Sequence, residues 1–182
     1  QQDFSQDFVV SPVISGSPAT GYNIGAISVD PAIVIVTGPL DVLQSIDAVR
    51  GIQTSEVSVT DARADVQRTV QLVLPSGVRL QAGTAPIRVT VSIKPAIGEA
   101  TFRVVPQVRN VGAGLDVAAP QAVTITLAGD LPTLDALTPE AIVAFVDASG
   151  RTAGQFPLPL QVTPPPGTTV VRTDPGDASV TL

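Results

Sequence analysis

The chain has 182 residues, a hydrophobic fraction of 44% and a formal net charge of -6, and it contains no His, Cys, Met or Trp. It is long enough to bury a sizeable core, but the commonest metal ligands, the commonest general base and the thiolate nucleophile are missing, so most catalytic mechanisms are excluded. Its ten Lys and Arg residues are scattered, whereas binding to a phosphate backbone needs them clustered, so we expect no nucleic acid partner.

The first elements predicted are strands. Residues 1–7 are polar and are expected to fray. From Phe8 the run FVVSPVISG predicts a strand that contains Pro12, which cannot donate to a β-ladder and is therefore expected at an edge or a bulge. A second short strand is predicted from Gly21 to Ile24.

The most apolar stretch begins at Pro31 and reads PAIVIVTGPLDVLQSIDAV. Its alternation predicts a central strand with Val34 and Val36 on one face and Ile33 and Ile35 on the other. After the Gly-Pro turn, three apolar residues spaced three apart predict a short helix that packs on the sheet: Leu40, Leu43 and Ile46.

Further strands are predicted before the middle of the chain. They span Glu56 to Thr60, Arg68 to Leu74 and Ile87 to Ile93, and a Pro-Ser-Gly turn separates the last two. In the last strand, apolar residues alternate with polar ones, which is typical of a half-buried strand.

The second half of the chain repeats this order. Phe102 to Val108 again carries a Pro, Gly114 to Val117 predicts a short strand, and PQAVTITLAGDLPTLDAL follows from Pro120. We align Val34 with Val123, Val36 with Ile125 and Leu43 with Leu134. A period of about ninety residues suits a small domain rather than a solenoid repeat.

We therefore predict a mainly β protein with two tandem domains, residues 1–95 and 96–182. Each is expected to form a small, twisted, mostly antiparallel sheet with one short helix. In this alignment Ala122 and Thr124 occupy the positions of Ile33 and Ile35, so the outer face of the strand is apolar in the first copy alone. Two interpretations stay open: the isoleucines are covered by the helix or the other domain, or they form a surface for a partner.

Three other motifs have an ordinary structural explanation. Asp147-Ala148-Ser149-Gly150 is similar to an aspartic protease loop, but the spacing differs by one residue and a strand-ending turn uses the same residue types. Asp174 and Asp177 are too few carboxylates for Ca²⁺. Pro164 to Pro166 is better explained as the entry to a turn than as a polyproline ligand.

The pattern resembles the YbbR domain family. The resemblance is carried in the second copy by FRVVPQV, GLDV, the VTITL strand, AFVDASG, GQFPLPLQV and PPGTTVV, and in the first copy by Phe8 to Ile93. Family members are small β-rich modules, similar in fold to the ribosomal L25-type β-domain. They occur in tandem behind one N-terminal transmembrane helix on the outer side of bacterial membranes.

The resemblance implies a non-enzymatic regulatory module that is extracytoplasmic and tethered to the cell membrane. The best known members modulate a membrane-bound diadenylate cyclase, which makes cyclic di-AMP, so this cyclase is the expected partner. The resemblance supplies no catalytic residue, cofactor or metal. No apolar run here approaches the roughly 20 residues that cross a bilayer. The resemblance implies an anchor upstream of Gln1, and a chain that starts without Met agrees with this. The alternative is a passive spacer or adhesive module of the cell envelope.

Overall fold

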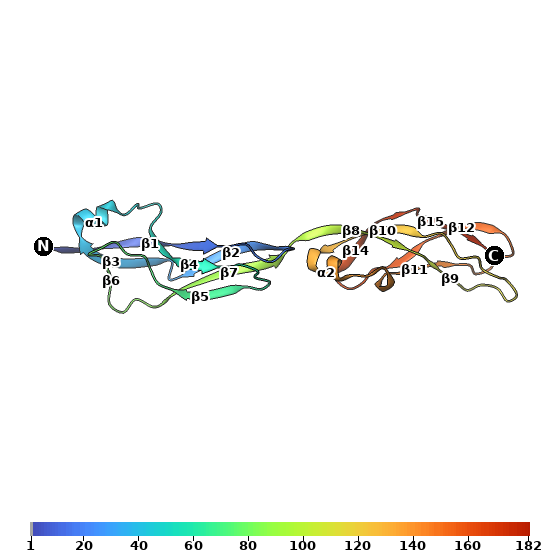
Figure 1. Ribbon diagram of the computed structural model, residues 1–182, viewed down its shortest axis with the longest axis horizontal. Coiled ribbons are helices and arrows are strands. Elements are labelled where there is room, and N and C mark those ends of the chain that lie inside the picture. The colour runs from blue at the N-terminus through green and yellow to red at the C-terminus, as the bar shows by residue number, and fades with distance from the viewer. Residues whose placement is uncertain (1) are drawn as a thin grey trace. The chain divides into compact units, whose positions relative to one another are not determined.

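The computed structural model describes residues 2–182 and divides into two compact units, residues 1–94 and 95–182. Strands are the main regular elements of both, and each carries one short α-helix (Figure 1). The predicted fold class, mainly β with tandem domains, is confirmed. Each unit is described by itself below.

The first unit contains two sheets, with strand orders β4-β1-β3-β6 and β2-β7-β5. A single bridge between Thr54 and Leu72 joins the β4 region to the segment that follows β5. Its elements are β1 (Asp3–Ser15), β2 (Tyr22–Asp30), β3 (Ile33–Pro39), α1 (Leu40–Ser45), β4 (Ile52–Ser58), β5 (Val66–Val70), β6 (Arg79–Leu80) and β7 (Ile87–Pro95).

The second unit contains three small sheets, with orders β14-β10-β8, β13-β11-β9 and β12-β15. Its elements are β8 (Ile97–Val104), β9 (Gln107–Arg109), β10 (Val123–Asp130), α2 (Leu131–Ala136), the 3₁₀-helix η1 (Pro139–Ala141), β11 (Val143–Asp147), β12 (Gln155–Pro159), β13 (Gln161–Thr163), β14 (Thr168–Asp174) and β15 (Asp177–Thr181).

The two units share one topology, as the repeat predicts. In the first, β1 pairs antiparallel with β3 along its first half and parallel with β4 along its second. In the second, the same path is divided between β8, antiparallel to β10, and β9, parallel to β11. The pairs β3–β6 and β5–β7 recur as β10–β14 and β12–β15.

The structure shifts the predicted alignment of the central strands by two residues. Phe8 pairs with Val34, and Phe102 pairs with Ile125. Gly38 and Gly129 both pass close to the backbone of a turn, and a Cβ there would lie 3.0 Å from the Gly77 carbonyl oxygen and 2.8 Å from the Gly167 carbonyl oxygen, respectively. Val34 therefore corresponds to Ile125 rather than to Val123, and the counterparts of Ile33 and Ile35 are Thr124 and Thr126.

Proline breaks the long first strand in both units. At Pro12 the pairing of β1 with β4 shifts register, as expected for a residue without an N–H. The next amide, Val13 N–H, is taken up by the buried Thr54 hydroxyl at 3.1 Å. In the second unit Pro106 lies between β8 and β9, so the strand is interrupted there.

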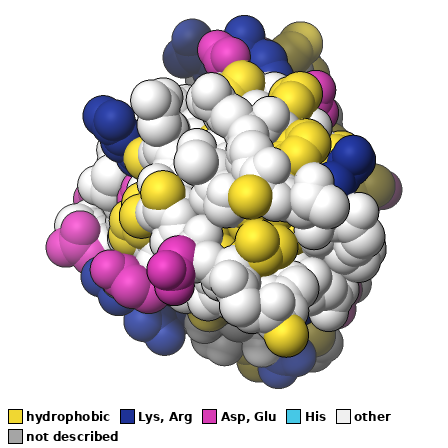
Figure 2. All heavy atoms as spheres, turned by 90° about the vertical axis from the view of Figure 1, so that its right-hand side faces the viewer, with side chains coloured by type: hydrophobic (Ala, Val, Ile, Leu, Met, Phe, Trp, Pro, Cys, Tyr) yellow, Lys and Arg dark blue, Asp and Glu magenta, His cyan; other side chains and the backbone are white. Residues whose placement is uncertain are grey.

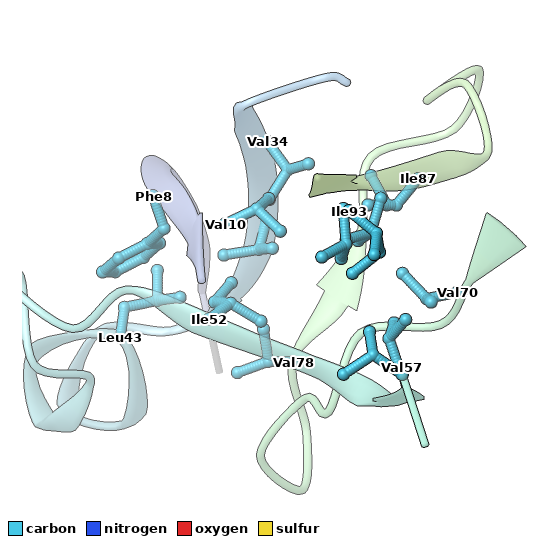
Figure 3. Packing of buried hydrophobic residues seen from close by; sticks show 14 residues of the cluster. Phe8, Val10, Val34, Leu43, Ile52, Val57, Val70, Val78, Ile87 and Ile93 are labelled. Carbon is cyan, nitrogen blue, oxygen red and sulfur yellow. The ribbon is translucent and has the colours of Figure 1, made fainter. Parts of the chain in front are cut away.

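Each unit has its own core, made of the inward residues of its strands and one leucine of its helix. Figure 3 shows the first, where Phe8, Val10, Val34, Leu43 and their neighbours point into a common interior. In the second, Leu134 takes the place of Leu43 among the buried residues. The predicted amphipathic helices and central strands are thus confirmed.

Two local predictions are wrong, and one strand was missed. Asp3 to Asp7 do not fray, because their backbone pairs with β3. Gly114 to Val117 form no strand, and only the next residue, Ala118, makes a bridge, to Thr181. Strand β14, which pairs with β10, was not expected from the sequence.

Candidate interaction surface

The outer face of the first unit's main sheet carries an exposed group of apolar side chains. Ile33 is 59% exposed and Ile35 is 38% exposed, while Val34 and Val36 between them face the core. Val9 of β1 lies directly opposite Ile33 in the ladder and is 48% exposed. We refer to Val9, Ile33 and Ile35 as the apolar patch.

The position of β3 in the sheet explains why the patch is accessible. This strand lies between β1 and β6, and its inner residues fill the core. Strict alternation then directs Ile33 and Ile35 outward, away from α1. The interpretation that the short helix covers these isoleucines is therefore wrong, because Leu43 of α1 packs in the core on the other face.

Polar groups border the patch on two sides. Asp7 lies opposite Ile35, and farther along the same two strands the hydroxyls of Ser5 and Thr37 are 3.0 Å apart. The patch therefore ends where the sheet face becomes hydrophilic.

A hollow of about 420 Å³ adjoins the patch. Its floor includes the β3 residues, and its far wall is the loop 81–85. The loop is fixed at its start because Gln81 N–H donates to the Ile35 carbonyl oxygen at 3.0 Å. It then turns at Thr84, whose hydroxyl donates to the Gln81 carbonyl oxygen at 2.7 Å. The apolar patch is thus one side of a shallow, open groove.

The second unit provides an internal comparison for this surface. The counterparts of Val9, Ile33 and Ile35 are Arg103, Thr124 and Thr126, because Arg103 pairs with Thr124 as Val9 pairs with Ile33. The two threonines are half-buried, and the Thr126 hydroxyl lies 3.3 Å from that of Thr101. The same fold therefore forms with a hydrophilic outer face, and the apolar patch is not required for folding.

The sequence identified two of the three patch residues. Ile33 and Ile35 stand out because both faces of one strand are apolar. Val9 was missed, since its place beside Ile33 depends on the pairing of β1 with β3. Nothing in the composition of the loop 81–85 predicted the hollow.

The motifs with ordinary structural explanations lie in turns. Asp147 ends β11, and its Oδ1 accepts hydrogen bonds from Asn110 Nδ2 at 3.0 Å and from Ser149 N–H at 2.9 Å. These bonds, the one from Asn110 first, lower the pKa of the Asp147 carboxyl. The Asp147 carboxylate therefore stabilises the turn that ends β11.

Two further turns account for the remaining motifs. The Pro164 to Pro166 segment enters a turn that the Thr168 hydroxyl closes on the Pro165 carbonyl oxygen at 2.8 Å. Asp174 and Asp177 flank the connection between β14 and β15. Among residues 2–182 there is no group of three or more His, Cys, Asp or Glu placed to hold a metal ion.

On the face seen in Figure 2, basic side chains are spread around the rim, several acidic side chains gather at the lower left, and a small apolar group lies near the centre. Within the part of the chain that the structure describes, no helix is long and apolar enough to cross a membrane.

The fold and the surface together define a tandem β-domain protein whose first unit carries an exposed apolar patch. Residues 8–93 match the family model described as YbbR-like protein. This match covers the first unit, and the recognition made from the sequence is confirmed. No curated protein matches the sequence.

Three solved structures are similar to parts or all of the chain. A YbbR-like protein from Streptococcus pneumoniae TIGR4 is 18% identical with a TM-score of 0.38, covering 100% of this chain and 94% of that one. SuR18C from Streptococcus thermophilus is 20% identical with a TM-score of 0.40, covering 53% and 89%. The YbbR-like domain of lmo2119 from Listeria monocytogenes is 21% identical with a TM-score of 0.37, covering 46% and 91%.

Proposed function

We propose that this chain is the extracytoplasmic part of a membrane-tethered, non-enzymatic regulator that acts by protein contact on a membrane-bound diadenylate cyclase. The family match supports the regulatory role, because the best known YbbR proteins modulate that enzyme. The observation on this molecule that carries the proposal is the apolar patch. Three large apolar side chains are exposed in the first unit at positions that are Arg, Thr and Thr in the second.

The patch suits a protein partner better than a small ligand. Burying one Val or Ile side chain contributes about 1.5–3 kcal/mol, and these three start from intermediate exposure, so the gain on docking is a few kcal/mol. The adjoining groove is open and has no buried charged group to orient a small molecule. A partner that inserts an apolar side chain beside Ile33 would gain this energy without a specific polar contact.

The test uses the full-length anchored protein reconstituted with the cyclase in membranes of defined composition. The double variant Ile33→Thr, Ile35→Thr keeps β-branching and copies the second unit's own residues, so the fold is expected to persist. We expect it to lower capture of the cyclase and to shift the cyclic di-AMP production rate toward that of the cyclase alone. The matched control is Val49→Thr, Val73→Thr, which removes two exposed valines of the same unit outside the patch.

The alternative is a passive spacer or adhesive module, and the tandem repetition of one compact unit favours it. A spacer predicts that both double variants behave like the parent in capture and in cyclic di-AMP production. The cyclase proposal is wrong if the wild-type protein neither binds the reconstituted enzyme nor changes its rate.

A further inference from the structure

Within residues 2–182, strand β2 is a long sheet edge whose charged residue, Asp30, is the last of the strand. It pairs with β7 on one side, and within residues 2–182 no strand pairs with its other side. Six consecutive residues of this nine-residue strand, 23–28, are exposed. From Tyr22 to Val29 it contains neither a charged residue nor a proline.

Other edge strands of the two units carry the features that normally prevent edge pairing. Strand β6 is only two residues long, β12 contains two prolines, β8 contains Glu99 and Arg103, and β14 contains Arg172 and a register shift. Short length, charge, proline and bulges all oppose addition of a further strand. From Tyr22 to Val29, strand β2 has none of these protections.

The second unit shows that the fold does not need this strand. The corresponding segment there is irregular and keeps only the bridge between Ala118 and Thr181. It also contains Asp116 between two apolar residues, whereas the charged residue of β2, Asp30, is the last of its strand; a proline follows both segments. The long, unprotected edge is thus a property of the first unit alone.

We propose that β2 pairs antiparallel with β2 of a second copy of this chain. In an antiparallel pair, residues directly opposite each other have side chains on the same face of the sheet. When two identical strands pair about a two-fold axis, the two residue numbers of every opposite pair therefore add up to the same even number. The register that uses all nine residues is centred on Ala26. It places Ile24 opposite Ser28 and Gly25 opposite Ile27 of the second copy.

Gly25 gives this register a specific fit. Its φ lies outside the left-handed region, and a Cβ there would have ordinary contacts, 3.5 Å from Ser92 Cβ and 3.6 Å from Lys94 Cδ. Its own chain therefore gives no reason for a glycine, which weakens a strand interior. In the self-paired register it leaves room beside Ile27 of the second copy, and this occurs twice by symmetry.

The charges are also compatible with self-pairing. The one ionisable group of the strand besides the Tyr22 phenol is Asp30, and this register places it opposite Tyr22 of the second copy. The two Asp30 carboxylates lie at opposite ends of the ribbon. No like charges therefore lie opposite each other across the interface.

Sedimentation equilibrium of the full chain tests the proposal. A nine-residue ribbon is a small interface, so we expect a reversible dimer with a Kd on the order of 100 µM. Ala26→Lys places two ammonium groups opposite each other at the two-fold axis and should weaken dimerisation about fivefold or more. Ala26→Glu should do the same, whereas Ala26→Thr, which is uncharged and β-branched, should dimerise at least as well as the parent.

The decisive sample is an equal mixture of the Ala26→Lys and Ala26→Glu chains. Opposite charges then meet at the axis, and the mixture should regain the affinity that each variant loses on its own. Circular dichroism melts establish that all three variants are folded. A wild-type chain that stays monomeric into the millimolar range, a mixture without recovery, or a dimer lost in Ile33→Thr, Ile35→Thr but kept in Ala26→Lys would each overturn the proposal.

Discussion

A charge placed at Val36 tests how the first unit is held together. Val36 is fully buried in β3, where it pairs with Gln6 of β1 and Leu80 of β6. Val36→Asp removes side-chain burial worth about 1.5–3 kcal/mol. Keeping the new carboxyl protonated at pH 7, about three pH units above an ordinary Asp pKa, adds roughly 4 kcal/mol. A domain of this size has a total stability of roughly 5–14 kcal/mol, so we expect the first unit to lose most or all of its folded population.

Hydrogen exchange measured by mass spectrometry shows which unit responds. We expect amides of residues 1–94 to lose protection in Val36→Asp, while those of residues 95–182 keep it, since each unit has its own core. The matched control is Ile33→Asp on the exposed face of the same strand, opposite the uncharged Val9, for which the change in unfolding free energy should be about 1 kcal/mol or less.

The pH dependence gives a second check on Val36→Asp. Burial raises the pKa of the introduced carboxyl above its value in the unfolded chain. The protonation penalty therefore applies at neutral pH and shrinks as the pH falls toward the ordinary Asp pKa. Val36→Asn has no ionisable group at this position, so its loss of stability should be the same at neutral pH as at a pH near the ordinary Asp pKa. If Val36→Asp melts within a few degrees of the parent, the strand faces are assigned wrongly; if both units lose protection together, they fold as one.

Two smaller perturbations test local hydrogen bonds. Thr54→Val removes the hydroxyl that accepts a hydrogen bond from Val13 N–H. Leaving that amide unpaired should lower the unfolding free energy, measured by chemical denaturation, by about 1–2 kcal/mol. Thr54→Ser keeps a hydroxyl and should retain most of the parent's stability. Asn110→Ala removes the main cause of the lowered Asp147 pKa, so an NMR titration should show the pKa rising toward its ordinary value. A lowered carboxyl pKa stabilises the folded state at pH values above that pKa, so this part of the parent's advantage over the variant should disappear as the pH falls through the Asp147 pKa. The cost of placing Ala at residue 110, where φ is 56°, should remain at every pH.

The alternation of the central strands made their faces predictable but not their register. Val34, Val36 and their counterparts have a period of two, and a shift of two residues leaves every side chain on the same face. The sequence alignment made such a shift. Contacts between distant segments fix the register, because Gly38 and Gly129 each pass close to a turn from another part of the chain.

Backbone pairing explains the other differences between prediction and structure. Asp3 to Asp7 have polar side chains, yet a ladder bonds main-chain groups and tolerates polar side chains on its solvent face. Conversely, Gly114 to Val117 have a suitable composition but no neighbour positioned to pair with all of them. Likewise, Val9 belongs to the apolar patch through its cross-strand partner Ile33, a relation between segments more than twenty residues apart.

Comparison of the two units distinguishes the residues of the first unit that the fold needs from those that it does not need. Positions that are apolar in both, such as Val36 and its counterpart Leu127, belong to the cores. The apolar patch and strand β2 are instead features that the second unit forms without. They lie on different sheets of the first unit, so a dimer through β2 would leave the patch free for a partner. Changes at sites without shared contacts normally have additive effects. Ala26→Lys should therefore reduce self-association without altering cyclase binding measured on monomers. The double variant Ile33→Thr, Ile35→Thr should reduce cyclase binding without altering self-association.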